Sequence, residues 1–169
     1  VDEAYSGDGF IGLCLLKNKA DVVSTKDLYK IGCVAKIVRK INLPDGGVNV
    51  FIATQKRFKI RKIVNEINPI AAAVQYLDDE EEKSEEVEAL TRALLSEMKQ
   101  LSENNPLFSE EMRLNMINID HPGKIADFIA SILNIPKEEQ QKVLEITNIK
   151  KRMETVFIHI KKEQELLQV

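Results

Sequence analysis

The chain has 169 residues, of which 44% are hydrophobic and 30% charged, and its formal net charge is −3. This length and composition allow one large domain or two small ones with a core that needs no disulfide bonds. No run approaches the roughly 18 apolar residues of a membrane span, and no secretory signal pattern opens the chain, so we expect an intracellular protein without membrane partners. Because the chain begins at Val1 rather than Met, we interpret it as a piece of a longer protein.

Charge is divided unevenly along the sequence. Residues 1–76 contain 12 Lys and Arg against 7 Asp and Glu, whereas residues 77–169 contain 12 against 20, which gives net charges of +5 and −8. The first part shows patterns typical of strands, and the second shows helical periodicity almost throughout. We therefore predict an α+β protein with a β-rich part over residues 1–77, an acidic linker over 78–86 and a helical part over 87–169.

Several segments of the first part are predicted to be antiparallel strands. Residues 9–17 form a continuous apolar run, and residues 32–43 follow a polar loop. The sequence PDGG at 44–47 predicts a hairpin turn, because proline presets φ and Asp-Gly tolerates positive φ. Residues 48–64 and 68–77 complete a small barrel or strongly bent sheet with a basic outer face.

Neither the cysteines nor the acidic run indicates a metal or redox site. Cys14 and Cys33 lie inside apolar strand-like runs, where a reduced thiol behaves as a small hydrophobic residue. The run DDEEEKSEE at 78–86 contains no glycine or turn of the kind a calcium loop requires. It is typical of a solvated linker or of a helix start.

The second part predicts a series of helices, one of which begins within NIDHPGKIADFIASILNI at residues 118–135. Asp120 or His121 would cap this helix, and Pro122 suits its first turn, so a helix start is favoured over catalysis. His159 is expected to point to solvent. A final helix, capped by Asn148, runs to the end of the chain. Apolar stripes mark the inner faces of these two helices: Ile125, Phe128, Ile129, Ile132 and Leu133 on the first, and Ile149, Met153, Val156, Phe157, Ile160 and Leu167 on the last.

At these residues the sequence resembles the N-terminal substrate-recognition domain of Lon proteases. The resemblance passes through residues 7–18, 27–53, 68–77 and 118–156. A family pattern of Asp, Pro, Gly, apolar, Ala and Asp, followed later by Arg, falls at Asp120, Pro122, Gly123, Ile125, Ala126, Asp127 and Arg152. The apolar segment that usually opens the family is absent. One or two barrel strands are therefore expected to be missing, and the ATPase and protease domains to lie outside this chain.

The resemblance implies a PUA-like (pseudouridine-synthase-and-archaeosine-transglycosylase-like) barrel, then a helical bundle whose long last helix leads toward the ATPase domain. It implies a non-catalytic domain that binds unfolded or damaged proteins for a hexameric, ATP-dependent serine endopeptidase. The bacterial cytoplasm is the expected location, with the mitochondrial matrix second. No catalytic, cofactor or metal residue is assigned here, because the chain shows neither a phosphate loop nor a recognisable serine–lysine pair. ATP and Mg would belong to the ATPase domain.

Two segments are candidates for binding. A stretch that would contact unfolded, acidic clients comprises Arg57, Phe58, Lys59 and Arg61, and the alternative is an edge strand whose cations discourage aggregation. A helical segment that would contact a neighbouring domain or self-associate comprises Phe157, Ile160, Leu166 and Leu167, and the alternative is a core stripe. We expect the fragment itself to self-associate weakly or not at all.

Two rival functions stay open. An RNA-binding module would suit the positive first part, but its basic residues are not interleaved with aromatic residues and the whole chain is acidic. A ligand-binding module related to cereblon would predict a small-molecule pocket and flanking domains.

Overall fold

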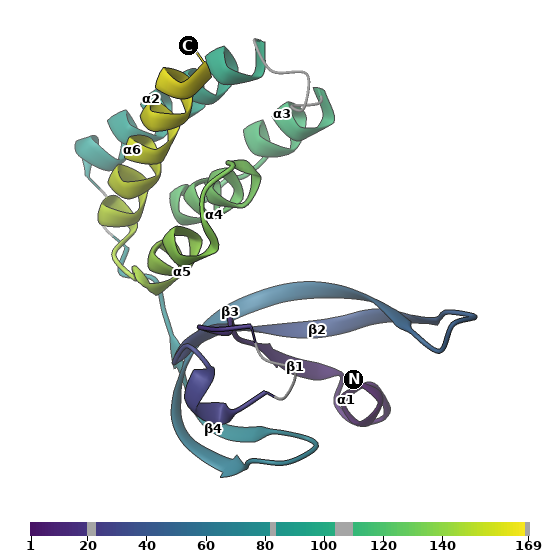
Figure 1. Cartoon of the computed structure of the whole chain (residues 1–169). Coiled ribbons are helices and arrows are strands. Elements are labelled where there is room, and N and C mark those ends of the chain that lie inside the picture. Colours follow the sequence, from purple (N-terminus) through teal and green to yellow (C-terminus); the bar gives the residue numbers. More distant parts are fainter. Residues whose placement is uncertain (20–22, 82–83, 104–109, 168–169) are drawn as a thin grey trace. The chain divides into compact units, whose positions relative to one another are not determined.

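The computed structural model describes residues 1–19, 23–81, 84–103 and 110–167. The chain divides into two units, Val1–Asp78 and Asp79–Val169, which we call the sheet unit and the helical unit and describe separately (Figure 1). The predicted α+β class is confirmed, since strands dominate the first unit and helices the second.

The sheet unit is built on one antiparallel sheet in which strands that follow one another in sequence lie side by side, in the order β1-β2-β3-β4. Among the described residues this sheet is bent but does not close, so the bent-sheet form of the prediction holds (Figure 1). Its elements are α1 (Asp2–Ser6), β1 (Phe10–Leu13), the 3₁₀ turn η1 (Thr25–Asp27), β2 (Ile31–Asn42), β3 (Val48–Asn65) and β4 (Ala71–Leu77).

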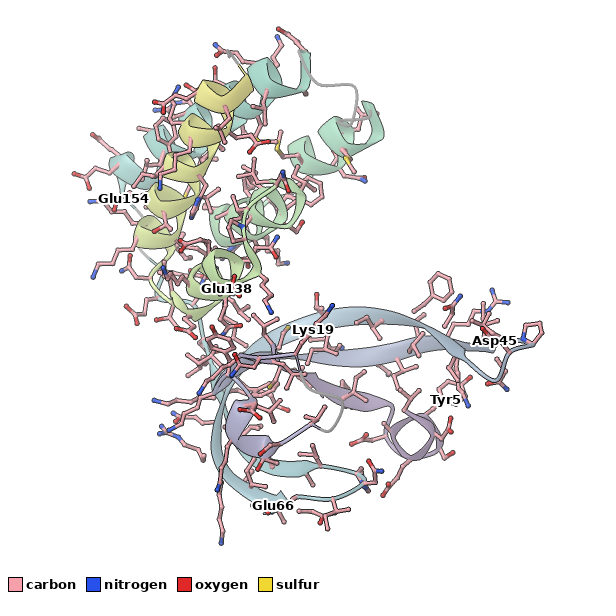
Figure 2. All side chains as sticks on the ribbon, in the orientation of Figure 1. Tyr5, Lys19, Asp45, Glu66, Glu138 and Glu154 are labelled. Carbon is pink, nitrogen blue, oxygen red and sulfur yellow. The ribbon has the colours of Figure 1, made fainter. Side chains whose placement is uncertain are left out.

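The predicted hairpin turn joins β2 to β3. Gly46 has φ +83°, which glycine adopts without the steric penalty of a side chain. The Asp45 carboxylate, at the hairpin tip in Figure 2, accepts a hydrogen bond from the Gly47 amide at 2.9 Å. The Leu43 amide donates to the Gly47 carbonyl at 2.8 Å. The PDGG sequence therefore sets the register of the long β2–β3 ladder.

The core of the sheet unit is small and centres on one aromatic ring. Phe58, Ala35 and Ile37 are its buried apolar residues. Gly12 and Gly32 leave room for the Phe58 ring, because a Cβ on Gly32 would lie 2.9 Å from the ring atom Cζ. The two glycines of β1 and β2 are thus required by a close approach across the sheet.

The helical unit packs α2 and α4 against the long C-terminal helix, with α5 beside α4 and α6 (Figure 1). Its helices are α2 (Glu85–Glu103), α3 (Glu110–Ile117), α4 (Pro122–Ile132), α5 (Lys137–Glu145) and α6 (Ile149–Leu167). Their buried apolar residues form one cluster: Val87, Leu94, Met98, Leu101, Met116, Ile125, Ala126, Ile129, Ala130, Leu133, Val143, Ile149, Met153, Val156 and Ile160. The stripes predicted for α4 and α6 supply much of this cluster, and Phe128, Ile132 and Phe157 lie partly buried at its margin.

Two helix starts agree with the sequence, although one cap differs. Pro122 occupies the first turn of α4 as predicted, but the His121 side chain makes no capping hydrogen bond. Its Nε2 lies 3.2 Å from a carboxylate oxygen of Glu81 instead. At α6 the predicted cap is confirmed, since Asn148 Oδ1 accepts from the Lys151 amide at 3.0 Å.

Within the described ranges, no helix combines the length and apolar character needed to cross a bilayer. In those same ranges, no cluster of three or more His, Cys, Asp and Glu side chains is arranged to hold a metal ion.

Candidate substrate-binding surfaces and a buried charge cluster

The predicted client-binding stretch lies on β3, which is an interior strand of the sheet. Arg57 pairs in register with Leu77 of β4, and Lys59 pairs with Gln75. Arg61 extends the row and donates a hydrogen bond from Nη2 to the Gln75 side chain. Because β2 and β4 flank β3 at Arg57 and Lys59, the interpretation of these two cations as protection of an exposed strand edge is wrong, whereas the β2 ladder ends before Arg61.

Phe58 differs from the three cations around it. Its side chain is only 4% exposed, and its ring lies over the backbone of Gly12 and Gly32. Alternation along the strand sends its ring to the opposite face from Arg57 and Lys59. Phe58 is therefore a core residue and offers almost no surface to a client, while client binding by Arg57, Lys59 and Arg61 stays a prediction.

Large apolar side chains are exposed on the β2–β3 hairpin. Val38 is 66% exposed and Phe51 is 57% exposed. The register shift between Ile37 and Arg39 places Val38 beside the segment that contains Phe51. We define the apolar hairpin surface as Val38, Val48, Phe51 and Ile52, which are all exposed and which strand alternation distributes over both faces of the hairpin.

A second exposed apolar group surrounds the β3–β4 turn. Val64 and Ile67 are 68% and 77% exposed, on either side of Glu66, which Figure 2 labels.

Neither of these two exposed apolar groups was predicted from the sequence. Consecutive apolar residues such as Val50, Phe51 and Ile52 would have been a signal, because alternation then places apolar side chains on both faces of the strand.

The candidate association segment of α6 divides into a buried and an exposed part. Ile160 is fully buried, and Phe157 is partly buried with Lys161 Nζ 5.4 Å from its ring centroid. Leu166 is 74% exposed. The Leu167 side chain lies outside the described residues. The core alternative therefore accounts for Ile160, and contact with a neighbouring domain or a second copy through Leu166 stays a prediction.

A buried charge cluster lies where α6 begins. Arg152 has no exposed surface, and its guanidinium forms ion pairs with Asp79 and Asp127. Nη1 donates to Asp79 Oδ2 at 3.0 Å, and Nη2 donates to the other oxygen of the same carboxylate. Nε donates to the Ile146 carbonyl at 2.8 Å. This paired, hydrogen-bonded arrangement is the form in which a buried charge is tolerated.

Three residues of the sequence pattern, Gly123, Asp127 and Arg152, meet at this cluster. Pro122 starts α4, Gly123 follows it, and Asp127 lies one turn further along the same helix. A Cβ on Gly123 would lie 2.7 Å from Asp79 Oδ2 and 3.2 Å from Arg152 Nη1. Glycine at this position therefore leaves the space that the ion pair fills, and the pattern marks a structural site of the helical unit.

The expectation that His159 points to solvent is wrong. The residue is 7% exposed in α6, and its Nε2 lies 3.8 Å from Glu139 of α5. Burial lowers the His159 pKa below its usual value of 6.5, and Lys162 and Lys142 act in the same direction while Glu139 opposes them. Hydrophobic spacing places His159 on the outer face of α6. In the structure, α5 covers that face at His159.

Neither Cys14 nor Cys33 forms a disulfide, and both are partly buried in the sheet unit. Burial raises the pKa of the Cys14 thiol, which keeps it protonated and weakly nucleophilic. This agrees with a packing role for Cys14.

Comparison with known proteins gives the family. Residues 1–162 match the family described as the ATP-dependent protease La (LON) substrate-binding domain. Lon protease from Treponema pallidum (strain Nichols) is 67% identical over 170 residues, which cover 100% of this chain and 19% of that protein. Lon protease from Leptospira interrogans is 44% identical over 171 residues, which cover 100% of this chain and 20% of that protein. The chain thus spans about one fifth of the length of these relatives.

Solved structures support the same fold. The N-terminal domain of a Mycobacterium avium complex Lon protease matches 95% of this chain and 82% of its own, with a TM-score of 0.72 and 18% identity. A Lon N-terminal domain protein from Xanthomonas campestris matches 93% of this chain and 79% of its own, with a TM-score of 0.62 and 14% identity. At these identities the likeness concerns the fold alone. By its sequence match over residues 1–162, the chain belongs to the family of Lon protease substrate-binding domains.

Proposed function

We propose that this chain recognises substrates for an ATP-dependent serine protease of the Lon type, by binding unfolded or damaged polypeptides that other parts of the protein then unfold and degrade. The observation that carries the proposal is the family match over residues 1–162, since that family is described as substrate-binding. Catalysis, ATP and Mg would belong to parts of the protein beyond this chain, which spans about a fifth of its relatives.

The exposed apolar residues of the sheet unit support this role. Unfolded clients expose apolar segments that folded proteins bury, so a receptor for them needs accessible apolar surface. The apolar hairpin surface supplies such side chains, and Arg39 lies opposite Phe51 in the register. A cation beside an apolar contact would favour clients whose apolar segments are flanked by acidic residues.

Assembly would strengthen weak individual contacts. In a hexamer, a client held by one copy meets the next copy at a high effective concentration, so overall affinity exceeds that of a single contact. Leu166, near the end of α6, is an exposed residue through which the helix would meet a neighbouring domain. The bacterial relatives support a bacterial protein, for which we propose the cytoplasm as the location.

Binding to an unfolded polypeptide tests the function. Fluorescence anisotropy would follow the titration of labelled lysozyme, reduced and carboxymethylated to keep it unfolded, with this chain. We expect saturable binding of the unfolded form and none of native lysozyme. Phe51→Ser should weaken binding several-fold, because it removes an exposed apolar contact without touching the core.

A matched control comes from the helical unit. Ile158 is 54% exposed, close to the 57% of Phe51, so Ile158→Ser removes a similar apolar surface elsewhere. Equal losses for Phe51→Ser and Ile158→Ser would contradict recognition by the hairpin. Tight, steeply salt-dependent binding of single-stranded RNA, together with no binding of unfolded lysozyme, would replace the proposal by the RNA-binding alternative.

A further inference from the structure

We propose that residues 79–81 are a strap that Arg152 fixes to the helical unit, so that Asp78 alone serves as the flexible joint between the two units. The acidic composition of residues 78–86 is typical of a solvated linker. The contacts of residues 79–81 are instead those of an integral part of the helical unit.

The backbone of the strap is hydrogen-bonded to the α5–α6 connection. The Glu80 amide donates to the Thr147 carbonyl at 3.0 Å, and the Ile149 amide donates to the Glu80 carbonyl at 3.4 Å. Glu80 and Asn148 form a parallel β-bridge. A segment that exchanges backbone hydrogen bonds in both directions has lost the conformational freedom of a linker.

Each side chain of the strap also contacts the helical unit. Asp79 forms the two-pronged ion pair with the buried Arg152. Glu80 Oε1 accepts from the Thr147 hydroxyl at 2.8 Å. Glu81 lies 3.2 Å from His121 Nε2. Of these three contacts, only the Asp79–Arg152 pair involves a fully buried charge. If this pair is broken, water cannot solvate the buried guanidinium, so its loss costs more than the loss of either exposed contact.

On the other side of the joint, the chain is held by the sheet. Leu77 is the last residue of β4 and pairs with Arg57 of β3. The Asp78 carboxylate lies 2.5 Å from Lys56 Nζ, a pair with both side chains largely exposed. Leu77 is held by the β3–β4 ladder and Asp79 by the ion pair with Arg152. The backbone dihedral angles of Asp78 are therefore the main ones that can change in the connection between the two units. Release of the strap would add three residues, roughly 10 Å of extended chain, to the connection.

Amide exchange of the whole 169-residue chain, measured by NMR, tests the strap. The Glu80 amide should be protected in the unmodified chain. Asp79→Asn should speed its exchange about ten- to a hundredfold, because a hydrogen-bonded charge is lost from a buried partner. The matched control is Asp127→Asn, which removes the other carboxylate of Arg152 but leaves the strap attached. It should change Glu80 exchange far less.

Backbone ¹⁵N relaxation gives a readout that mere loss of stability would not produce. In Asp79→Asn the two units should tumble more independently than in the unmodified chain, while amides inside α6 keep their protection. An unprotected Glu80 amide in the unmodified chain would overturn the proposal. So would equal effects of Asp79→Asn and Asp127→Asn, or relaxation that Asp79→Asn leaves unchanged. No client takes part in these measurements, so their result is independent of the proposed function.

Discussion

Two buried polar residues of α6 are accommodated in different ways. Arg152 has two carboxylates and the carbonyl oxygens of Ile146 and Thr147 around its guanidinium. His159 has a single carboxylate at 3.8 Å, which is too long for a hydrogen bond. Pairing and hydrogen bonds offset the burial of the Arg152 charge, whereas burial favours the neutral form of His159.

Stability should therefore depend on His159 at mildly acidic pH. Its pKa in the folded chain is lowered below 6.5, so the unfolded chain binds the proton more readily. The contribution is fully present above about pH 6.5 and is lost as the pH falls from there toward the lowered pKa. Urea unfolding followed by circular dichroism at several pH values should show the free energy of unfolding falling over this range.

Substitution of each histidine separates its contribution. His159→Gln should flatten the pH dependence between neutral and mildly acidic solution, whatever its effect at neutral pH. His121→Gln removes the other histidine of the chain and serves as the control. A slope that survives His159→Gln but disappears in His121→Gln would contradict the assignment.

Gly123→Ala tests the space around the ion pair. Alanine favours a helix over glycine by about 1 kcal/mol, so propensity alone predicts a gain in stability. We expect a net loss, because the added Cβ would lie 2.7 Å from Asp79 Oδ2. Thermal unfolding would measure the effect, with the exposed Ser131→Ala in the same helix as a control that should be neutral or slightly stabilising. A Gly123→Ala chain as stable as the control would show that the ion pair does not need this space.

At the scale of elements, α4 links the sequence pattern to the helical core. Pro122 and Gly123 shape its first turn, and the stripe that follows is buried against the other helices. Ile129 is fully buried, whereas the neighbouring Phe128 is only partly buried. The smaller side chain therefore occupies the position that matters more for packing.

Ile129→Ala should lower the free energy of unfolding of the helical unit by about 2–5 kcal/mol, because it leaves a cavity in a fully packed site. Urea denaturation followed by far-ultraviolet circular dichroism would measure the loss. Leu166→Ala is the control, since its side chain is 74% exposed and surface truncations usually change stability by less than about 0.5 kcal/mol. A loss no larger than that of the control would contradict the packing role of Ile129.

At the scale of the whole molecule, the chain carries two separate cores. The sheet unit buries Phe58, Ala35 and Ile37, and the helical unit buries the larger cluster around α6. The three tyrosines, at positions 5, 29 and 76, all belong to the sheet unit, and the sequence contains no tryptophan. Tyrosine fluorescence therefore reports on the sheet unit, while far-ultraviolet circular dichroism is dominated by the helical unit.

We expect the two units to unfold independently. Ile129→Ala should shift the circular dichroism transition and leave the tyrosine transition in place. Phe58→Ala should do the reverse, with a cost of about 3–5 kcal/mol to the sheet unit. A urea titration of both variants with both signals would show the effect. Transitions that move together in either variant would mean that the units unfold as one cooperative body.

The sequence by itself determined the local elements and the family. The hairpin at Gly46, the start of α4 at Pro122 and the cap at Asn148 depend on neighbours within a few residues, so pattern and turn chemistry predict them. The core stripe of α6 followed from helical periodicity in the same way, as the burial of Ile160 shows.

Only the tertiary structure decided which polar and aromatic residues are buried. Phe58 was predicted to bind clients, but glycines from two other strands enclose its ring. His159 is covered by a helix that periodicity within α6 does not reveal. Arg152 meets Asp79, which lies 73 residues away in sequence. Burial and charge pairing arise from contacts between distant segments, whereas sequence patterns report only what neighbours along the chain impose.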